Sequence, residues 1–155
     1  MSTLIRTDQV PTADLVDFLR GVLAKMWLPM DIRAISVLPD LASVSEVGRV
    51  IIGAFGAAGA DVYVGARLSH LFAQAGAGVP DGTDVSGRSE PFGTGHLFLE
   101  SVFRSVLPTA LAHGITTEDA AAAALAEFDR DATRFAFRPM LWPLLIGAWK
   151  RKERA

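Results

Sequence analysis

Apolar residues recur every three or four positions along five stretches of this chain, and four of the stretches end at glycine or proline. This spacing gathers apolar side chains on one helix face, which must then be buried. The clearest stretch, residues 47–55, follows Ser43-x-x-Glu46, the pattern of a capping box, and ends at Gly56 and Gly59. The other stretches predict helices over residues 11–26, 61–75, 96–113 and 116–130.

Strand signals are fewer and shorter. Residues 31–38 contain β-branched side chains in partial alternation, and residues 141–149 form an apolar run that suits a buried strand. Residues 79–91 are rich in Gly, Asp and Ser and suit either a loop or, over residues 83–89, a polar edge strand. The prediction is an α+β fold with about five helices packed on a small, mostly antiparallel sheet of about three strands. Residues 1–155 are expected to form a single domain.

Composition narrows the class of protein. Half of the residues are hydrophobic and 21% are charged, a balance that excludes disorder. The absence of cysteine excludes disulfides, thiolate catalysis and cysteine-based metal sites. No apolar run reaches the ~18 residues that cross a bilayer, and the N-terminal residues lack the layout of a signal peptide. We therefore expect a cytoplasmic protein with no membrane partner.

Charge does not indicate a nucleic-acid partner. The net charge is −2, and the one basic cluster, residues 150–154, is interpreted as a solvated tail. The glycines of Gly53-x-x-Gly56-x-x-Gly59 follow a helical stretch rather than a strand, so they predict a helix end and not a dinucleotide-binding loop. No complete catalytic motif is present, and no metal ligand and no cofactor is predicted from the residues.

His96 is the histidine most open to a function. It follows Gly93-Thr94-Gly95, which predicts a flexible turn leading into a helix, a place where side chains often face a ligand. Glu90 and Glu100 flank this turn and could exchange protons with His96. The other two histidines favour structural roles: His113 stabilises a helix C-terminus, and His70 lies on a helix surface.

Aromatic residues gather near the ends of the predicted elements. A segment around His96 and a Phe-, Met- and Trp-rich stretch over residues 135–142 suit an apolar pocket with few polar groups. They suit a packed core equally well, and both interpretations stay open. The candidates for a pocket wall are Phe92, Phe98, Phe137, Trp142 and Trp149.

Four segments occur in the order expected for a known family. They are residues 59–76 (GADVYVGARLSHLFAQAG), 88–92 (RSEPF), 114–119 (GITTED) and 145–151 (LIGAWKR). Together they resemble the C-terminal half of class I S-adenosylmethionine-dependent methyltransferases, particularly small-molecule tailoring enzymes. On that resemblance they match the helix after the fifth strand, the sixth strand, the turn into a late helix and the seventh strand.

The N-terminal part departs from that family. The family binds its methyl donor through a Gly-rich loop after the first strand and an acidic residue after the second, and residues 1–58 contain neither. The N-terminal part instead contains Arg6-Thr-Asp8, Pro11, Asp14, Phe18, Leu23 and Pro29-Met-Asp31. With them, residues 1–34 resemble the start of the sensory domain of AraC-type regulators, and no DNA-binding half follows. The resemblance therefore implies that the substrate side is kept while the donor site is lost, so neither methyl transfer nor a cofactor is expected.

These observations predict a cofactor-independent enzyme of specialised metabolism, a cyclase or isomerase acting on a small apolar organic substrate such as a polyketide. Its expected catalytic groups are His96, Tyr63 and Glu90. The alternative is a non-catalytic ligand-binding pseudoenzyme or an accessory subunit of a partner methyltransferase, and a ligand sensor is a third possibility. Because residues 31–38 would form an unprotected sheet edge, we also expect a homodimer.

Overall fold

The computed structural model describes residues 30–31 and 35–151, which fall into two compact units. Residues 35–62 and 87–143 form the first, called here the helical unit. Residues 30–31, 63–86 and 144–151 form the second, called here the sheet unit. The helix predicted over residues 11–26 lies outside the described residues.

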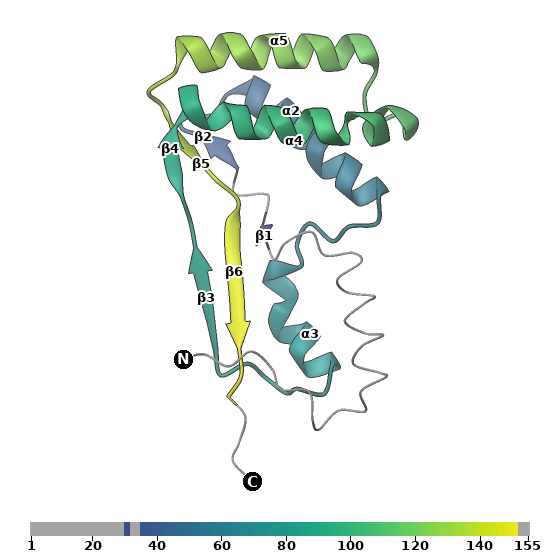
Figure 1. Cartoon of the computed structure of the whole chain (residues 1–155), viewed down its shortest axis with the longest axis vertical. Helices are drawn as coiled ribbons and strands as arrows, with labels where there is room; N and C mark the ends of the chain where they lie inside the picture. Colours follow the sequence, from purple (N-terminus) through teal and green to yellow (C-terminus); the bar gives the residue numbers. More distant parts are fainter. Residues whose placement is uncertain (1–29, 32–34, 152–155) are drawn as a thin grey trace. The chain divides into compact units, whose positions relative to one another are not determined.

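The helical unit contains three long helices, two of which, α4 (Phe92–Ala112) and α5 (Glu118–Arg134), run alongside each other (Figure 1). Its core consists of apolar side chains from all three helices, including Ile51, Leu99, Phe103 and Phe128, each fully buried. Burial of each such side chain contributes about 1.5–3 kcal/mol. In chain order the elements are β2 (Ser36–Val37), α2 (Ala42–Ala57), β4 (Ser89–Pro91), α4 (Phe92–Ala112), α5 (Glu118–Arg134) and β5 (Pro139–Leu141).

Helix α2 confirms the helical spacing of its sequence but not the capping box. The N-cap is Leu41, which has no side-chain capping hydrogen bond. Ser43 lies inside the helix, where its hydroxyl donates to Asp131 Oδ2 at 2.6 Å. Glu46 pairs instead with Arg49 at 2.6 Å. The capping-box prediction is wrong because both side chains have partners that the local pattern does not reveal.

The conformation of the segment Gly93-Thr94-Gly95 also differs from the predicted one. It belongs to the first turn of α4, which begins at Phe92, and it is not a flexible turn. The amide of Gly93 donates to the carbonyl of Ala136 at 2.9 Å, and a Cβ on Gly93 would lie only 2.8 Å from the Ala136 Cβ. Glycine is needed here for close approach of two backbones, not for a turn.

Helix α5 begins as its sequence predicts. Thr117 is the N-cap, with its Oγ1 accepting from the amide of Ala120 at 3.2 Å, and Glu118 and Asp119 occupy the first turn. Both features stabilise a helix N-terminus. At the end of the preceding helix, His113 is the C-cap residue and Gly114 has a φ of 64°, as expected for a helix stop.

The sheet unit contains a three-stranded antiparallel sheet with β6 at its centre. The helix predicted over residues 61–75 is shorter in the structure, where it covers only Leu68–Gln74 after a 3₁₀ turn. Its end agrees with the prediction, and Gly76 and Gly78 follow it with positive φ. The elements in chain order are β1 (Met30–Asp31), the 3₁₀ turn η2 (Gly65–Arg67), α3 (Leu68–Gln74), β3 (Gly82–Ser86) and β6 (Leu144–Trp149).

The α+β class is therefore confirmed, with one difference in the number of elements. The described residues contain four α-helices, and the fifth predicted helix lies outside them. They contain two three-stranded antiparallel sheets, β1-β6-β3 and β2-β5-β4, rather than one. Of the predicted strand over residues 31–38, Asp31 belongs to β1 of one sheet and Ser36–Val37 form β2 of the other, while residues 32–34 lie outside the described residues. The predicted strand over residues 141–149 is interrupted at Pro143, since proline has no N–H to donate to a ladder.

The two segments compared with the sixth and seventh methyltransferase strands lie in separate sheets. Residues 89–91 of the first form β4, which pairs with β5, whereas residues 145–149 of the second belong to β6. Strand β6 pairs instead with β3. Strand β3 lies within residues 79–91, for which the sequence suited either a loop or an edge strand. None of the helices within residues 30–31 and 35–151 is long and apolar enough to cross a membrane.

Candidate functional site

Three of the eight predicted site residues come together in the helical unit, and we call this group the Trp142 platform. The indole Nε1 of Trp142 donates to Glu90 Oε1 at 2.9 Å. The ring of Phe98 stacks on Trp142 with a centroid distance of 4.4 Å and an interplanar angle of 24°. Arg88 completes the platform: it donates to Glu90 Oε2 at 2.7 Å and its guanidinium carbon lies 4.8 Å from the Trp142 ring centroid.

Strand pairing places these residues. Glu90 lies opposite Met140 in the antiparallel pair β4–β5, and the amide of Trp142 extends this ladder by donating to the carbonyl of Arg88 at 2.9 Å. Helix α4 starts directly after β4, which brings Phe98 back over the indole. A Cβ on Gly95 would lie 3.0 Å from Glu90 Oε1, so the glycine leaves room for the carboxylate beside the helix.

The platform is partly open to solvent. The side chain of Glu90 is only 17% exposed, whereas the side chain of Arg88 is 66% exposed and Phe98 is 37% exposed. Phe98 and the Arg88 guanidinium both lie over the Trp142 ring, so the platform combines a partly exposed Phe98 ring with an adjacent ion pair. Such a combination can stack a ring and orient it through one polar contact.

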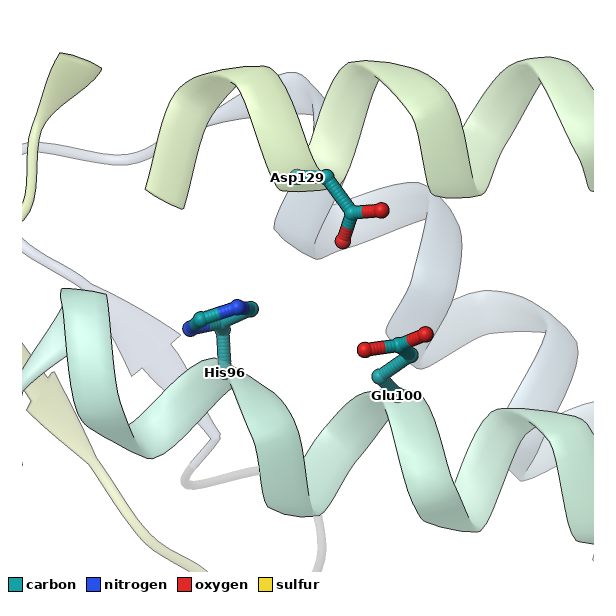
Figure 2. Close-up of side chains that lie close together, drawn as sticks. All are labelled: His96, Glu100 and Asp129. Atoms are coloured by element: carbon teal, nitrogen blue, oxygen red, sulfur yellow. The ribbon is translucent and has the colours of Figure 1, made fainter. Parts of the chain in front are cut away.

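A second group of polar side chains lies between α4 and α5. His96 and Glu100 project from α4 and Asp129 projects from α5 towards them (Figure 2). One ligand atom of each residue lies within 4.8 Å of the other two. The His96 Nδ1 lies 3.1 Å from the carbonyl oxygen of Phe92. An imidazole and two carboxylates can exchange protons or hold a cation.

The two groups leave α4 in different directions. His96 and Phe98 are two positions apart, and residues at that spacing on a helix do not face each other. The prediction that placed His96 and Glu90 around one substrate is therefore not supported by their surroundings, because Glu90 belongs to the Trp142 platform and His96 to the α4–α5 group.

The remaining predicted residues are dispersed. Phe92 is fully buried and packs edge-to-face on Phe128 at 5.3 Å, so it belongs to the core. Phe137 is 97% exposed. Tyr63 and Trp149 belong to the sheet unit, where the Trp149 indole packs directly over Gly82 of β3.

Asp129 was missed by the sequence analysis. The spacing His96-x-x-x-Glu100 is visible in the sequence and places both side chains on one helix face. Asp129, in contrast, resembles its acidic neighbours Glu127 and Asp131, and together they suggest a solvated helix end. Only the packing of α5 against α4 distinguishes Asp129 from Asp131, which accepts a hydrogen bond from Ser43.

Comparison with known proteins identifies no relative: no protein family, no curated protein and no solved structure matches this chain. The methyltransferase resemblance consequently depends on the four sequence segments alone. Any function must be argued from the side chains that the fold brings together.

Proposed function

We propose that this chain binds a small apolar, ring-containing molecule on the Trp142 platform and acts on it as a cofactor-independent cyclase or isomerase of specialised metabolism. The observation that carries the proposal is the convergence of Glu90, Phe98 and Trp142. We also propose that the protein works in the cytoplasm on a polyketide-like substrate and retains the substrate side of a methyltransferase without methyl transfer.

The chemistry follows from what the platform offers. Two stacked rings provide an apolar face, which can hold a flexible substrate in a reactive conformation and lower the entropic part of the barrier. Glu90 is held by two donors, Trp142 and Arg88, so its carboxylate has a fixed position. In an isomerisation this carboxylate would take a proton from one carbon of the substrate and return it to another.

The alternative is a non-catalytic ligand-binding module or an accessory subunit of a partner enzyme. One observation favours it: each Glu90 oxygen already accepts a hydrogen bond, Oε1 from Trp142 and Oε2 from Arg88. On this alternative the Glu90 carboxylate serves to orient the indole, and the Trp142 platform binds its ligand and releases it unchanged.

The substitution Glu90→Gln distinguishes the enzyme from the non-catalytic binding module. The amide oxygen still accepts a hydrogen bond from the Trp142 indole, but the amide cannot act as a general base. An enzyme should bind a hydroxyanthraquinone probe as before while its turnover of a linear poly-β-ketone analogue falls at least about tenfold. Turnover is measured by the appearance of cyclised product. Unchanged turnover in Glu90→Gln would remove this carboxylate from the mechanism, and an absence of turnover in the unaltered protein would leave the binding module.

Methyl transfer has a separate test. Calorimetry with S-adenosylmethionine is expected to show no saturable heat, because the segments that seat the donor in the family have no counterpart in residues 1–58. Saturable binding of the donor would contradict this part of the proposal.

A further inference from the structure

We propose that His96, Glu100 and Asp129 form a binding site for a divalent transition-metal ion between α4 and α5 (Figure 2). Their ligand atoms lie within 4.8 Å of one another. Bonds of about 2.0–2.2 Å to a tetrahedral ion require a ligand separation of roughly 3.4 Å. A side-chain rotation, chiefly of the exposed Asp129, closes that difference.

The imidazole of His96 is prepared to bind an ion. A carbonyl oxygen can only accept, so the 3.1 Å contact with the Phe92 carbonyl places the proton of the neutral ring on Nδ1. The lone pair is then on Nε2. Metal-binding histidines usually donate their other ring N–H in this manner, which fixes both tautomer and orientation. The rings of Phe92 and Phe128 contact the imidazole edge-to-face at 6.1 Å and 6.0 Å and hold it in place.

The two carboxylates complete the group from different helices. Glu100 follows His96 by one helical turn and therefore lies on the same face of α4. Arg104 contacts Glu100 through Nε at 2.8 Å and Nη2 at 2.6 Å, and both contacts are to Oε1. Oε2 is thus the atom that can bind the ion. Asp129 is exposed on α5, so an ion can enter from solvent and keep water in its remaining coordination positions.

The donor set indicates the class of ion. An imidazole nitrogen with carboxylate oxygens suits zinc and its first-row neighbours, whereas Ca²⁺ and Mg²⁺ prefer oxygen ligands throughout. The proposal does not depend on the Trp142 platform, because Phe98 and His96 leave α4 in different directions.

The test uses the untagged full chain, stripped with a chelator and titrated with ZnCl₂ by calorimetry and with Co²⁺ by visible absorption. The unaltered protein is expected to bind one equivalent and to unfold at a higher temperature with zinc. Asp129→Asn should weaken binding at least about tenfold and abolish the thermal shift. Because Asp129 is exposed, this substitution leaves the core unchanged; His96→Asn is the second variant.

Two substitutions serve as matched controls: one removes a carboxylate near Asp129, and the other removes a histidine elsewhere in the chain. Glu127→Gln removes another exposed carboxylate of α5, one that pairs with Arg130, and His70→Asn removes an exposed imidazole of α3. Both controls should bind like the unaltered protein. The proposal is overturned if no saturable binding occurs, if binding survives both Asp129→Asn and His96→Asn, or if the controls lose binding equally.

Discussion

At the scale of single residues, Ser43 and Glu46 match the capping-box pattern but make other interactions in the structure. Ser-x-x-Glu at the start of a helical stretch indicates a reciprocal cap. In the protein, Ser43 is buried and donates to Asp131 of α5, while Glu46 pairs with Arg49 on the surface. The serine therefore joins two helices that are distant in sequence, and the glutamate contributes a local ion pair.

Ser43→Ala is expected to lower the free energy of unfolding by about 1.5–3 kcal/mol, because it removes a hydrogen bond to a charged group. Denaturant unfolding measures the change. A double-mutant cycle with Asp131→Asn should show coupling, since the two side chains share one bond. Additive effects of these two substitutions would show that Ser43 stabilises α2 in some other way.

Glu46→Gln should lower stability by less than about 0.5 kcal/mol at pH 7, because the ion pair with Arg49 is solvent-screened. The hydrogen bond from Arg49 lowers the pKa of Glu46 from 4.5. A carboxyl group whose pKa is lowered by folding stabilises the fold at any pH above its unfolded-state pKa. This stabilisation is lost as the pH falls through the folded-state pKa. The difference between the two proteins should therefore shrink as the pH falls below the ordinary pKa of a glutamate and vanish once the pH lies below the folded-state pKa of Glu46. A difference that grows in acid would contradict the ion pair.

At the scale of elements, the three long helices of the helical unit were predictable, but the start of α4 and the division of the strands were not. Periodic apolar residues define α2, and Thr117 with its acidic neighbours defines the start of α5. The start of α4 was misjudged because Gly93-Thr94-Gly95 resembles a turn, and a need for close packing leaves no separate mark in a sequence. The strands were divided for a similar reason, as β1 and β2 find their partners over a hundred residues away.

Gly93→Ala should destabilise the protein by about 1–3 kcal/mol, because its new Cβ would lie 2.8 Å from the Ala136 Cβ and 3.2 Å from the Ala136 Cα. The matched control is Gly48→Ala in α2, whose Cβ would have no neighbour within 4 Å. That control should stabilise by about 0.5–1 kcal/mol, the usual helical preference for alanine. Thermal unfolding of both variants measures the contrast, and equal shifts would refute the close approach of α4 to Ala136.

At the scale of the whole molecule, both candidate sites depend on pairings between distant segments. Glu90 meets Trp142 through the β4–β5 ladder, and Asp129 meets His96 through the packing of α5 on α4. The sequence identified Glu90, Phe98 and Trp142 as candidates, but their grouping without His96 follows only from the fold. No local pattern records which face of α4 receives which partner.

The homodimer stays a prediction, and it is now based on exposed apolar side chains rather than on an unprotected strand edge. Within the described residues the predicted edge strand is reduced to two short pieces, so an unprotected edge is a weaker argument. Phe137, at 97% exposure, and Leu97 and Leu38 are large apolar side chains open to solvent in the helical unit. Light scattering at micromolar concentration should give twice the mass of one chain, and Phe137→Ser should lower it. A monomeric unaltered protein would contradict the prediction.

The most direct test of the central claim follows the indole N–H signal of Trp142 by ¹⁵N nuclear magnetic resonance during titration with a hydroxyanthraquinone. The chain has three tryptophans, and Trp142→Phe assigns the signal. We predict a saturable shift of the Trp142 signal, whose N–H is bonded to Glu90, while the Trp149 signal stays in place. A Trp142 signal that does not move, or that moves only in step with both others, would contradict a ligand site on the Trp142 platform.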